Sequence, residues 1–140
     1  MANAIYNSFK KDIMSGAIDL DTDTIKVMLV TSSYTPNIDT HDFMDDVTNE
    51  VSGTGYTAGG AELASKTVTV DTTDDEGVFD AADLTWSTST ITARGAVLYK
   101  STGASTTSPL ICYFDFGSDQ TSSAGNFAIS WSSEGILNLG

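Results

Sequence analysis

Three aspartates at alternate positions, Asp19, Asp21 and Asp23, are the residues of this chain that most resemble a metal-binding motif. Carboxylates with this spacing form the first ligands of an EF-hand calcium loop. Such a loop also needs glycine at its sixth position and glutamate at its twelfth, where this chain has Thr24 and Val30. We therefore expect no EF-hand, and we assign no metal ligand and no cofactor. A looser calcium site, shared with a second acidic stretch later in the chain, stays open.

The single histidine, His41, would need a serine or another nucleophile held against it for catalysis, and the chain contains no Gly-x-Ser-x-Gly elbow. A loop histidine with a local hydrogen bond is the simpler interpretation. The glycines of Gly53-x-Gly55-x-x-Ala58 resemble a dinucleotide-binding loop only superficially, because that loop lies between a strand and a helix. A Ser/Thr-rich strand is expected after them, so backbone turning explains them better. We predict that the chain is not an enzyme.

Arg94 and Cys112 are each the only residue of their type. Arg94 lies within a strand-like run, where we expect it to pair with an Asp or Glu of the same fold, with a clamp between subunits as the alternative. Cys112 cannot form an internal disulfide and is expected to be a small buried apolar residue. The lone cysteine and the lack of a secretory signal at residues 1–5 fit synthesis in a reducing cytosol, without export.

The chain is strongly acidic, with a formal net charge of −13 from 19 acidic and 6 basic residues. This charge would repel nucleic acids and anionic membrane surfaces, so we expect no partner of either kind. No apolar run approaches the roughly 20 residues that are needed to span a bilayer. The length of 140 residues fits one domain, residues 1–140, with a core of its own.

Apolar runs of strand length recur along the chain, and small or polar turn residues such as Gly103, Gly117 and Gly125 separate them. We therefore predict a mainly β fold, an antiparallel β-sandwich or jelly-roll-like domain of roughly seven to nine strands. An acidic turn is expected at Thr72–Gly77. The predicted strands are Thr24–Thr31, Lys66–Asp71, Val78–Trp86, Ile91–Lys100, Leu110–Phe116, Asn126–Trp131 and Gly135–Leu139.

Alternation of side chains assigns faces to two of these strands. Both faces of Thr24–Thr31 are apolar, which predicts a strand at the centre of a sheet. In the run that begins at Leu110, the two-residue period places Leu110 and Cys112 on one face and Ile111 and Tyr113 on the other.

A short N-terminal α-helix is predicted within residues 1–16, because Ile5, Phe9 and Ile13 recur at every fourth position and Gly16 can end the helix. This apolar stripe must pack against the sheet. The predicted core consists of apolar residues of the helix and the strands. These residues are Ile5, Phe9, Ile13, Val27, Leu29, Leu98, Leu110, Cys112, Phe114, Phe127, Ile129, Trp131 and Leu137.

The segment from Ser32 to Gly60 lacks periodicity, apart from one helical turn expected around His41–Val47. An irregular segment of this length in a compact domain usually contacts a partner. Its apolar residues must be covered, and we predict that they bind the partner. The candidate partner-binding residues are Tyr34, Ile38, Phe43, Met44 and Tyr56.

Several stretches of the chain resemble a family of small virion structural proteins of tailed bacteriophages. They cover most of the chain, and they consist of turn glycines, core apolar residues and aromatics. The matching stretches are Gly55–Ala61, Trp86, Thr90–Tyr99, Pro109–Gly117, Gly125–Trp131 and Gly135–Leu137, together with the opening helix and the stretch Leu20–Val27.

The resemblance implies a virion component, and we expect a capsid decoration or cement protein on the outer head surface. Its expected partners are the major capsid protein and copies of itself, as in a homotrimer at a symmetry axis. Two other classes stay open: a tail-associated or receptor- and carbohydrate-binding module, which would show clustered exposed aromatics in a groove, and a hydrolytic enzyme, which would show a cleft with a perturbed histidine or carboxylate pair.

Overall fold

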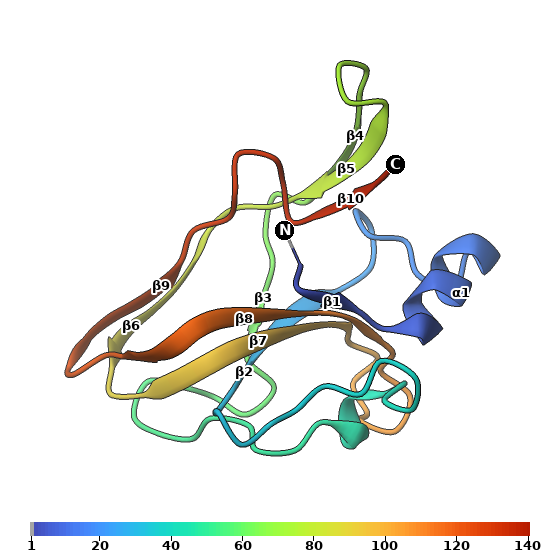
Figure 1. The fold of residues 1–140 in the computed structure, drawn as a ribbon. Coiled ribbons are helices and arrows are strands. Elements are labelled where there is room, and N and C mark those ends of the chain that lie inside the picture. Colours follow the sequence, from blue (N-terminus) through green and yellow to red (C-terminus); the bar gives the residue numbers. More distant parts are fainter. Residues whose placement is uncertain (1) are drawn as a thin grey trace.

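The computed structural model describes residues 2–140 of the chain (Figure 1). These residues form strands that pair antiparallel into sheets of five, three and two strands, which confirms the predicted mainly β fold and is consistent with a β-sandwich. The elements are β1 (Ala4–Ile5), α1 (Asn7–Ser15), β2 (Ile25–Val30), a 3-10 turn (Met44–Asp46), β3 (Ala61–Glu62), β4 (Thr67–Asp71), β5 (Glu76–Asp80), β6 (Leu84–Ser89), β7 (Thr92–Lys100), β8 (Leu110–Thr121), β9 (Gly125–Ile129) and β10 (Leu137–Leu139).

The five-stranded sheet, in the order β1-β8-β7-β2-β3, forms the centre of the molecule. The β6–β9 ribbon and the β10-β5-β4 sheet lie on one side of it, and the irregular segment 32–60 lies on the other (Figure 1). Each face of the central sheet therefore has its own cover. Both faces consequently need apolar side chains, and the strands of this sheet supply them.

Strand β2 shows this two-sided burial most clearly. It pairs with β7 from Ile25↔Lys100 to Val30↔Gly95 and with β3 on its other edge, so its predicted central position is confirmed. Alternate residues of β2 enter two separate apolar clusters, one on each face. The larger cluster lies beneath β6, β9, β5 and α1, and the smaller one lies beneath segment 32–60. The smaller cluster comprises Tyr6, Met28, Val30, Tyr34, Val97, Tyr99, Leu110 and Tyr113.

Strand β8 continues to Thr121, so the turn predicted at Gly117 does not end it. Its register against β7 shifts between Gly95↔Asp115 and Ala93↔Gln120, and residues 116–119 bulge out of the ladder. Gly117 has φ +82°, in the left-handed region. Bulges and turns use the same residue types, which is why the sequence pattern indicated a strand end here.

A second register shift in β8 changes the sheet faces on which Leu110 and Ile111 lie from those that were predicted. The pairs Leu98↔Cys112 and Tyr99↔Leu110 leave Ile111 without a directly opposed residue. Leu110 consequently lies in the smaller cluster with Tyr113, and Ile111 joins Cys112 in the larger one. The strict two-residue alternation was therefore wrong for Leu110 and Ile111, because a bulge inserts one extra residue into the ladder.

The N-terminal helix is shorter than predicted. Helix α1 begins at Asn7, and the residues Ala4 and Ile5 form β1 at the edge of β8 instead. Residue 1 of the predicted helix lies outside the described residues. Gly16 ends the helix with φ +75°, as expected for a left-handed C-terminal cap. The run Val78–Trp86 also differs from its prediction, because residues 81–83 break it into β5 and β6.

Most of the predicted core is buried, and four residues are only half-buried: Ile5, Ile13, Phe114 and Trp131. The prediction therefore overestimated the burial of these four side chains. Ile5 and Ile13 lie at the edge of the larger cluster, in β1 and α1. Phe114 and Trp131 line an open groove that is described below.

Candidate partner-binding surfaces

Arg94 lies in β7 and pairs with Asp115 of β8, with 2.9 Å between Arg94 Nε and Asp115 Oδ1. This confirms the ion pair expected within the fold. The backbone N–H of Gly117 donates to the same oxygen at 2.8 Å. The Gly117 hydrogen bond and then Arg94 lower the pKa of Asp115 below its ordinary value. The pair lies at the surface and joins the two strands beside the β8 bulge.

His41 takes part in a local hydrogen-bond network, as expected for a loop histidine. Its Nδ1 accepts from the backbone N–H of Asn37 at 3.2 Å and lies 3.0 Å from the hydroxyl of Tyr34. The Tyr34 hydroxyl also lies 2.8 Å from that of Tyr6. The His41 ring stacks on the Tyr34 ring with centroids 5.7 Å apart. These contacts hold the irregular segment against the start of the chain.

The aspartates of the Asp19–Asp23 motif bond among themselves and to a lysine. Asp23 accepts a hydrogen bond from the backbone N–H of Asp19 at 2.8 Å and forms an ion pair with Lys100, with 3.0 Å between Asp23 Oδ2 and Lys100 Nζ. A hydrogen bond between the Asp19 and Asp21 carboxyls lowers the pKa of Asp19 and raises that of Asp21. Residues 2–140 contain no group of three acidic, histidine or cysteine side chains placed to hold a metal ion.

Cys112 is fully buried in the larger cluster, as predicted. Burial raises the pKa of its thiol well above the ordinary value, because the surroundings disfavour the thiolate. The side chain therefore acts as a small apolar residue of the core.

The irregular segment 32–60 is attached at several points to β2 and to residues just before β7 and β8. Isolated bridges join Val30 to Glu50, Phe43 to Pro109 and Thr54 to Thr90. The expected helical turn is present at Met44–Asp46. The segment therefore forms the cover of the smaller apolar cluster, and its own apolar side chains fill part of that cluster.

Tyr56 and Glu50 fix the second half of this segment. Tyr56 donates from its hydroxyl to Glu50 Oε2 at 2.7 Å and accepts from the backbone N–H of Leu29 at 3.0 Å. The N–H of Gly59 donates to the same Glu50 oxygen at 2.7 Å. Burial and the neighbouring Glu50 carboxylate raise the pKa of Tyr56. Tyr56 is thus a structural residue of the fold, packed against the larger cluster.

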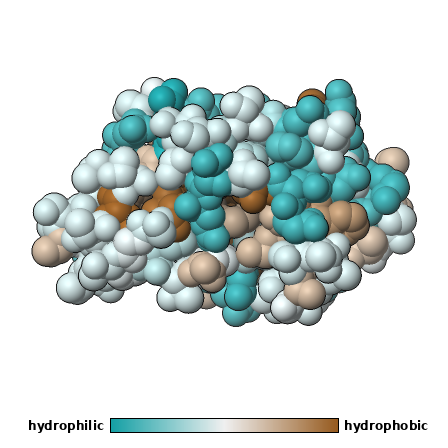
Figure 2. Space-filling view, turned by 90° about the horizontal axis from the view of Figure 1, so that it is seen from below, coloured by the Kyte–Doolittle hydropathy of each residue, from teal (hydrophilic) through white to brown (hydrophobic). Residues whose placement is uncertain are grey.

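The five predicted partner-binding residues divide into two groups. Tyr34 is buried, and Met44 and Tyr56 are half-buried against the two apolar clusters, so the fold itself covers much of these three side chains. Ile38 and Phe43 are 36% and 40% exposed. Figure 2 views this side of the molecule, where most of the surface is hydrophilic or intermediate and the apolar atoms form small, scattered patches. Ile38 and Phe43 are the most exposed members of the predicted set, and binding of a partner to the set stays a prediction.

A different surface carries more exposed apolar area. The β10-β5-β4 sheet, which we call the arm, rises away from the central sheet (Figure 1). The acidic turn predicted between its two longer strands is present, at residues 72–75. Three apolar side chains of the arm are strongly exposed: Val68 at 51%, Val70 at 77% and Leu139 at 72%.

The strand register explains why these side chains lie together. Val68 pairs with Phe79, which pairs with Leu137, and both of the latter are buried. One step outward, Val70 pairs with Gly77, which pairs with Leu139. Directly paired residues share a face of a sheet. The core-facing side of the arm therefore extends beyond the core, and we call its exposed part, Val68, Val70, Gly77 and Leu139, the arm face.

A hollow of about 350 Å³ lies at the outer end of the arm face. Gly77 has no side chain, so the hollow opens between Val70 and Leu139. Three of its lining residues are acidic, and none is lysine or arginine. Its lining residues are Val70, Asp71, Thr72, Asp75, Glu76, Gly77, Leu139 and Gly140.

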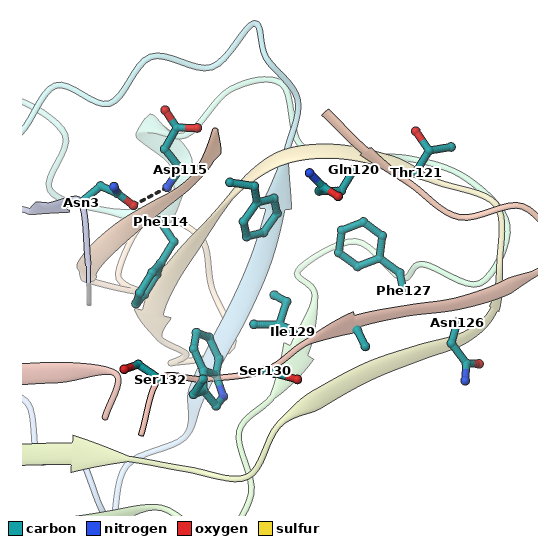
Figure 3. Close-up of a pocket in the computed structure, with 13 residues that line it drawn as sticks. Asn3, Phe114, Asp115, Gln120, Thr121, Asn126, Phe127, Ile129, Ser130 and Ser132 are labelled. Carbon is teal, nitrogen blue, oxygen red and sulfur yellow. Dashed lines mark hydrogen bonds between the residues drawn. The ribbon is translucent and has the colours of Figure 1, made fainter. Parts of the chain in front are cut away.

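A groove of about 730 Å³ lies between β8 and β9. Phe114 and Phe127 enter it from opposite walls, with Ile129 between them (Figure 3). We call it the aromatic groove. Its lining residues are Asn3, Phe114, Asp115, Phe116, Gln120, Thr121, Asn126, Phe127, Ala128, Ile129, Ser130, Trp131 and Ser132.

Sequence reasoning did not identify either surface. The Thr/Val alternation of β4 indicated a strand. Whether its valines are exposed depends on their neighbours across the sheet, Gly77 and the end of β10, which the sequence of β4 does not reveal. The groove depends on the bulge in β8 and on the separation of β8 from β9, for which the sequence has no local signal. Clustered aromatics after residue 110 were the one available hint.

No protein-family model, characterised protein or solved structure matches this chain in comparisons of sequence and fold. Among residues 2–140, no helix combines the length and the apolar character that a membrane crossing requires.

Proposed function

We propose that this chain is a structural protein of a virus particle, a capsid decoration protein that binds the outer head surface of a tailed bacteriophage through its arm face. The resemblance to small virion proteins of tailed bacteriophages is the reason for proposing a role in a virus particle. The choice of docking surface rests on one observation: Val70 and Leu139 form an exposed apolar row that is continuous with the core. Exposed apolar patches with a polar rim are typical of protein-binding sites.

The acidic rim defines the expected partner. Asp71, Asp75 and Glu76 are among the residues that line the hollow at the end of the arm, so a complementary surface presents an apolar side chain with Lys or Arg beside it. A second copy of this chain would bring an acidic surface of its own, given the net charge of −13. The major capsid protein is therefore the proposed partner of the arm, and association with further copies, as in a homotrimer, would use another surface. Ile38 and Phe43 are proposed as additional contacts.

The experiment compares three purified proteins on heads that lack the protein, and counts bound copies against concentration. The arm variant carries Val70→Ser with Leu139→Ser. The control carries Met14→Ser, which removes an apolar side chain that is 84% exposed on α1. We expect the arm variant to bind at least about tenfold more weakly, or about 1.4 kcal/mol, and the control to bind like the unchanged protein.

All three proteins should melt at closely similar temperatures, because the changed side chains are exposed. Full-affinity loading by the arm variant would exclude the arm face as the docking surface, and a Phe43→Ala variant would then test segment 32–60. An unchanged protein that never binds heads would exclude the decoration function itself.

A further inference from the structure

The aromatic groove combines a fixed aromatic wall with accessible space. Trp131 is half-buried, and its indole Nε1–H donates to the carbonyl oxygen of Ala82 at 3.1 Å. The Trp131 ring also packs against Phe114 with centroids 5.4 Å apart at 54°. The ring is therefore held in one orientation while part of its apolar surface faces the groove. A ligand that stacks there needs no reordering of the site.

Polar groups with remaining hydrogen-bonding capacity lie beside this wall. Asn3 accepts from the N–H of Asp115 through Oδ1, which leaves its Nδ2 hydrogens available as donors. Gln120 donates through Nε2 to Ser118, which leaves its Oε1 available as an acceptor. Figure 3 shows both amides at the same groove as Phe114 and Phe127. A ligand in the groove would thus meet donors and acceptors beside an apolar floor.

The charges around the groove restrict the ligand further. No lysine or arginine lines it, and its one ionisable side chain, Asp115, is paired with Arg94. The net charge of −13 also repels anions. Phosphates, nucleotides and acidic sugars are therefore disfavoured. The volume of about 730 Å³ lies within the range of sites for small ligands, which is roughly 300–1,000 Å³.

We infer that the aromatic groove binds a neutral oligosaccharide. A sugar ring has an apolar C–H face that can stack on Trp131 and Phe114, and it has hydroxyls that both donate and accept, which suits the free groups of Asn3 and Gln120. The inference rests on the groove alone and does not depend on the proposed binding of the arm to viral heads.

The test titrates ¹⁵N-labelled protein with neutral and anionic oligosaccharides and follows the two indole N–H resonances by NMR. The neutral probes are cellohexaose, maltohexaose and N-acetylchitohexaose, and the anionic probes are sialyllactose and a heparin hexasaccharide. Trp131 borders the groove, whereas Trp86 is buried in the larger cluster. We expect at least one neutral probe to shift the Trp131 resonance saturably and with a larger change than that of Trp86.

Two groove variants and a control make the assignment specific. Trp131→Leu removes the ring but keeps an apolar side chain, and Gln120→Ala removes an amide at the groove. Each should weaken binding about tenfold, as expected for an aromatic or polar anchor. Asn7→Ala, an exposed amide on α1 outside the groove, should bind normally. For Trp131→Leu, backbone amide resonances of β8 and β9 replace the lost indole signal.

Three results would overturn the inference: no shift with any neutral probe at millimolar concentration, equal binding of the anionic probes, or unchanged binding by both groove variants. The same variants should still load onto heads. Loss of head binding by Gln120→Ala would instead assign the groove to a protein partner.

Discussion

Phe114 lies at the boundary between the larger apolar cluster and the aromatic groove, in contact with Trp131. Full burial of a phenylalanine makes its replacement by alanine cost about 3–5 kcal/mol. Because Phe114 is half-buried, we expect Phe114→Ala to lower the free energy of unfolding by only about 2 kcal/mol. Denaturant melts measure this loss.

Leu98→Ala is the matched comparison, since Leu98 is fully buried in the same cluster. We expect a loss of about 3–4 kcal/mol there. A Phe114→Ala loss equal to or larger than the Leu98→Ala loss would show that the groove is closed in solution and that Phe114 belongs to the core.

The connection from segment 32–60 into β3 depends on Gly60. This residue has φ +80°, and a Cβ added to it would lie 1.8 Å from the backbone oxygen of Val27. No rotamer change can relieve a clash with backbone. We therefore expect Gly60→Ala to destabilise the protein by more than about 3 kcal/mol, as steric and conformational strain add.

Gly103→Ala separates the two contributions. Gly103 has φ +90°, and nothing lies within 4 Å of an added Cβ, so only the conformational cost of about 1 kcal/mol applies. Thermal and denaturant melts of both variants measure the difference. Equal losses would mean that β3 does not approach β2 this closely in solution.

The elements that could be predicted from sequence are those with a repeating pattern. Strand β2 was placed at the centre of a sheet because both of its faces are apolar, and α1 was found from the spacing of Phe9 and Ile13. The end of β8 was predicted wrongly because Gly117 serves a bulge. Segment 32–60 was not predicted as a cover, since its contacts are isolated bridges and side-chain hydrogen bonds without any period.

At the scale of the whole molecule, the excess of negative charge opposes compactness. Nineteen acidic residues against six basic ones give −13, and salt screens the resulting repulsion, with a Debye length of about 10 Å at 0.1 M. We expect the melting temperature at pH 7 to rise by several degrees, on the order of 1 kcal/mol, between about 0.02 and 0.5 M NaCl.

The control repeats the salt series at about pH 4, close to the isoelectric point of 4.1. The net repulsion is absent there, so the stabilisation by salt should largely disappear. A melting temperature that falls with salt at pH 7 would mean that ion pairs such as Arg94–Asp115 outweigh the general repulsion.

The pairing of β2 determines when the central sheet can form while the chain is being synthesised. Its main partner is β7, and its other neighbour, β3, contacts only Lys26 and Val27. A ribosome adds roughly 5–20 residues per second and releases the N-terminal part first. A strand that is apolar on both faces therefore emerges long before residues 92–100 exist to pair with it. During translation β2 therefore stays without its main partner for seconds, and the central sheet can close only near the end of synthesis.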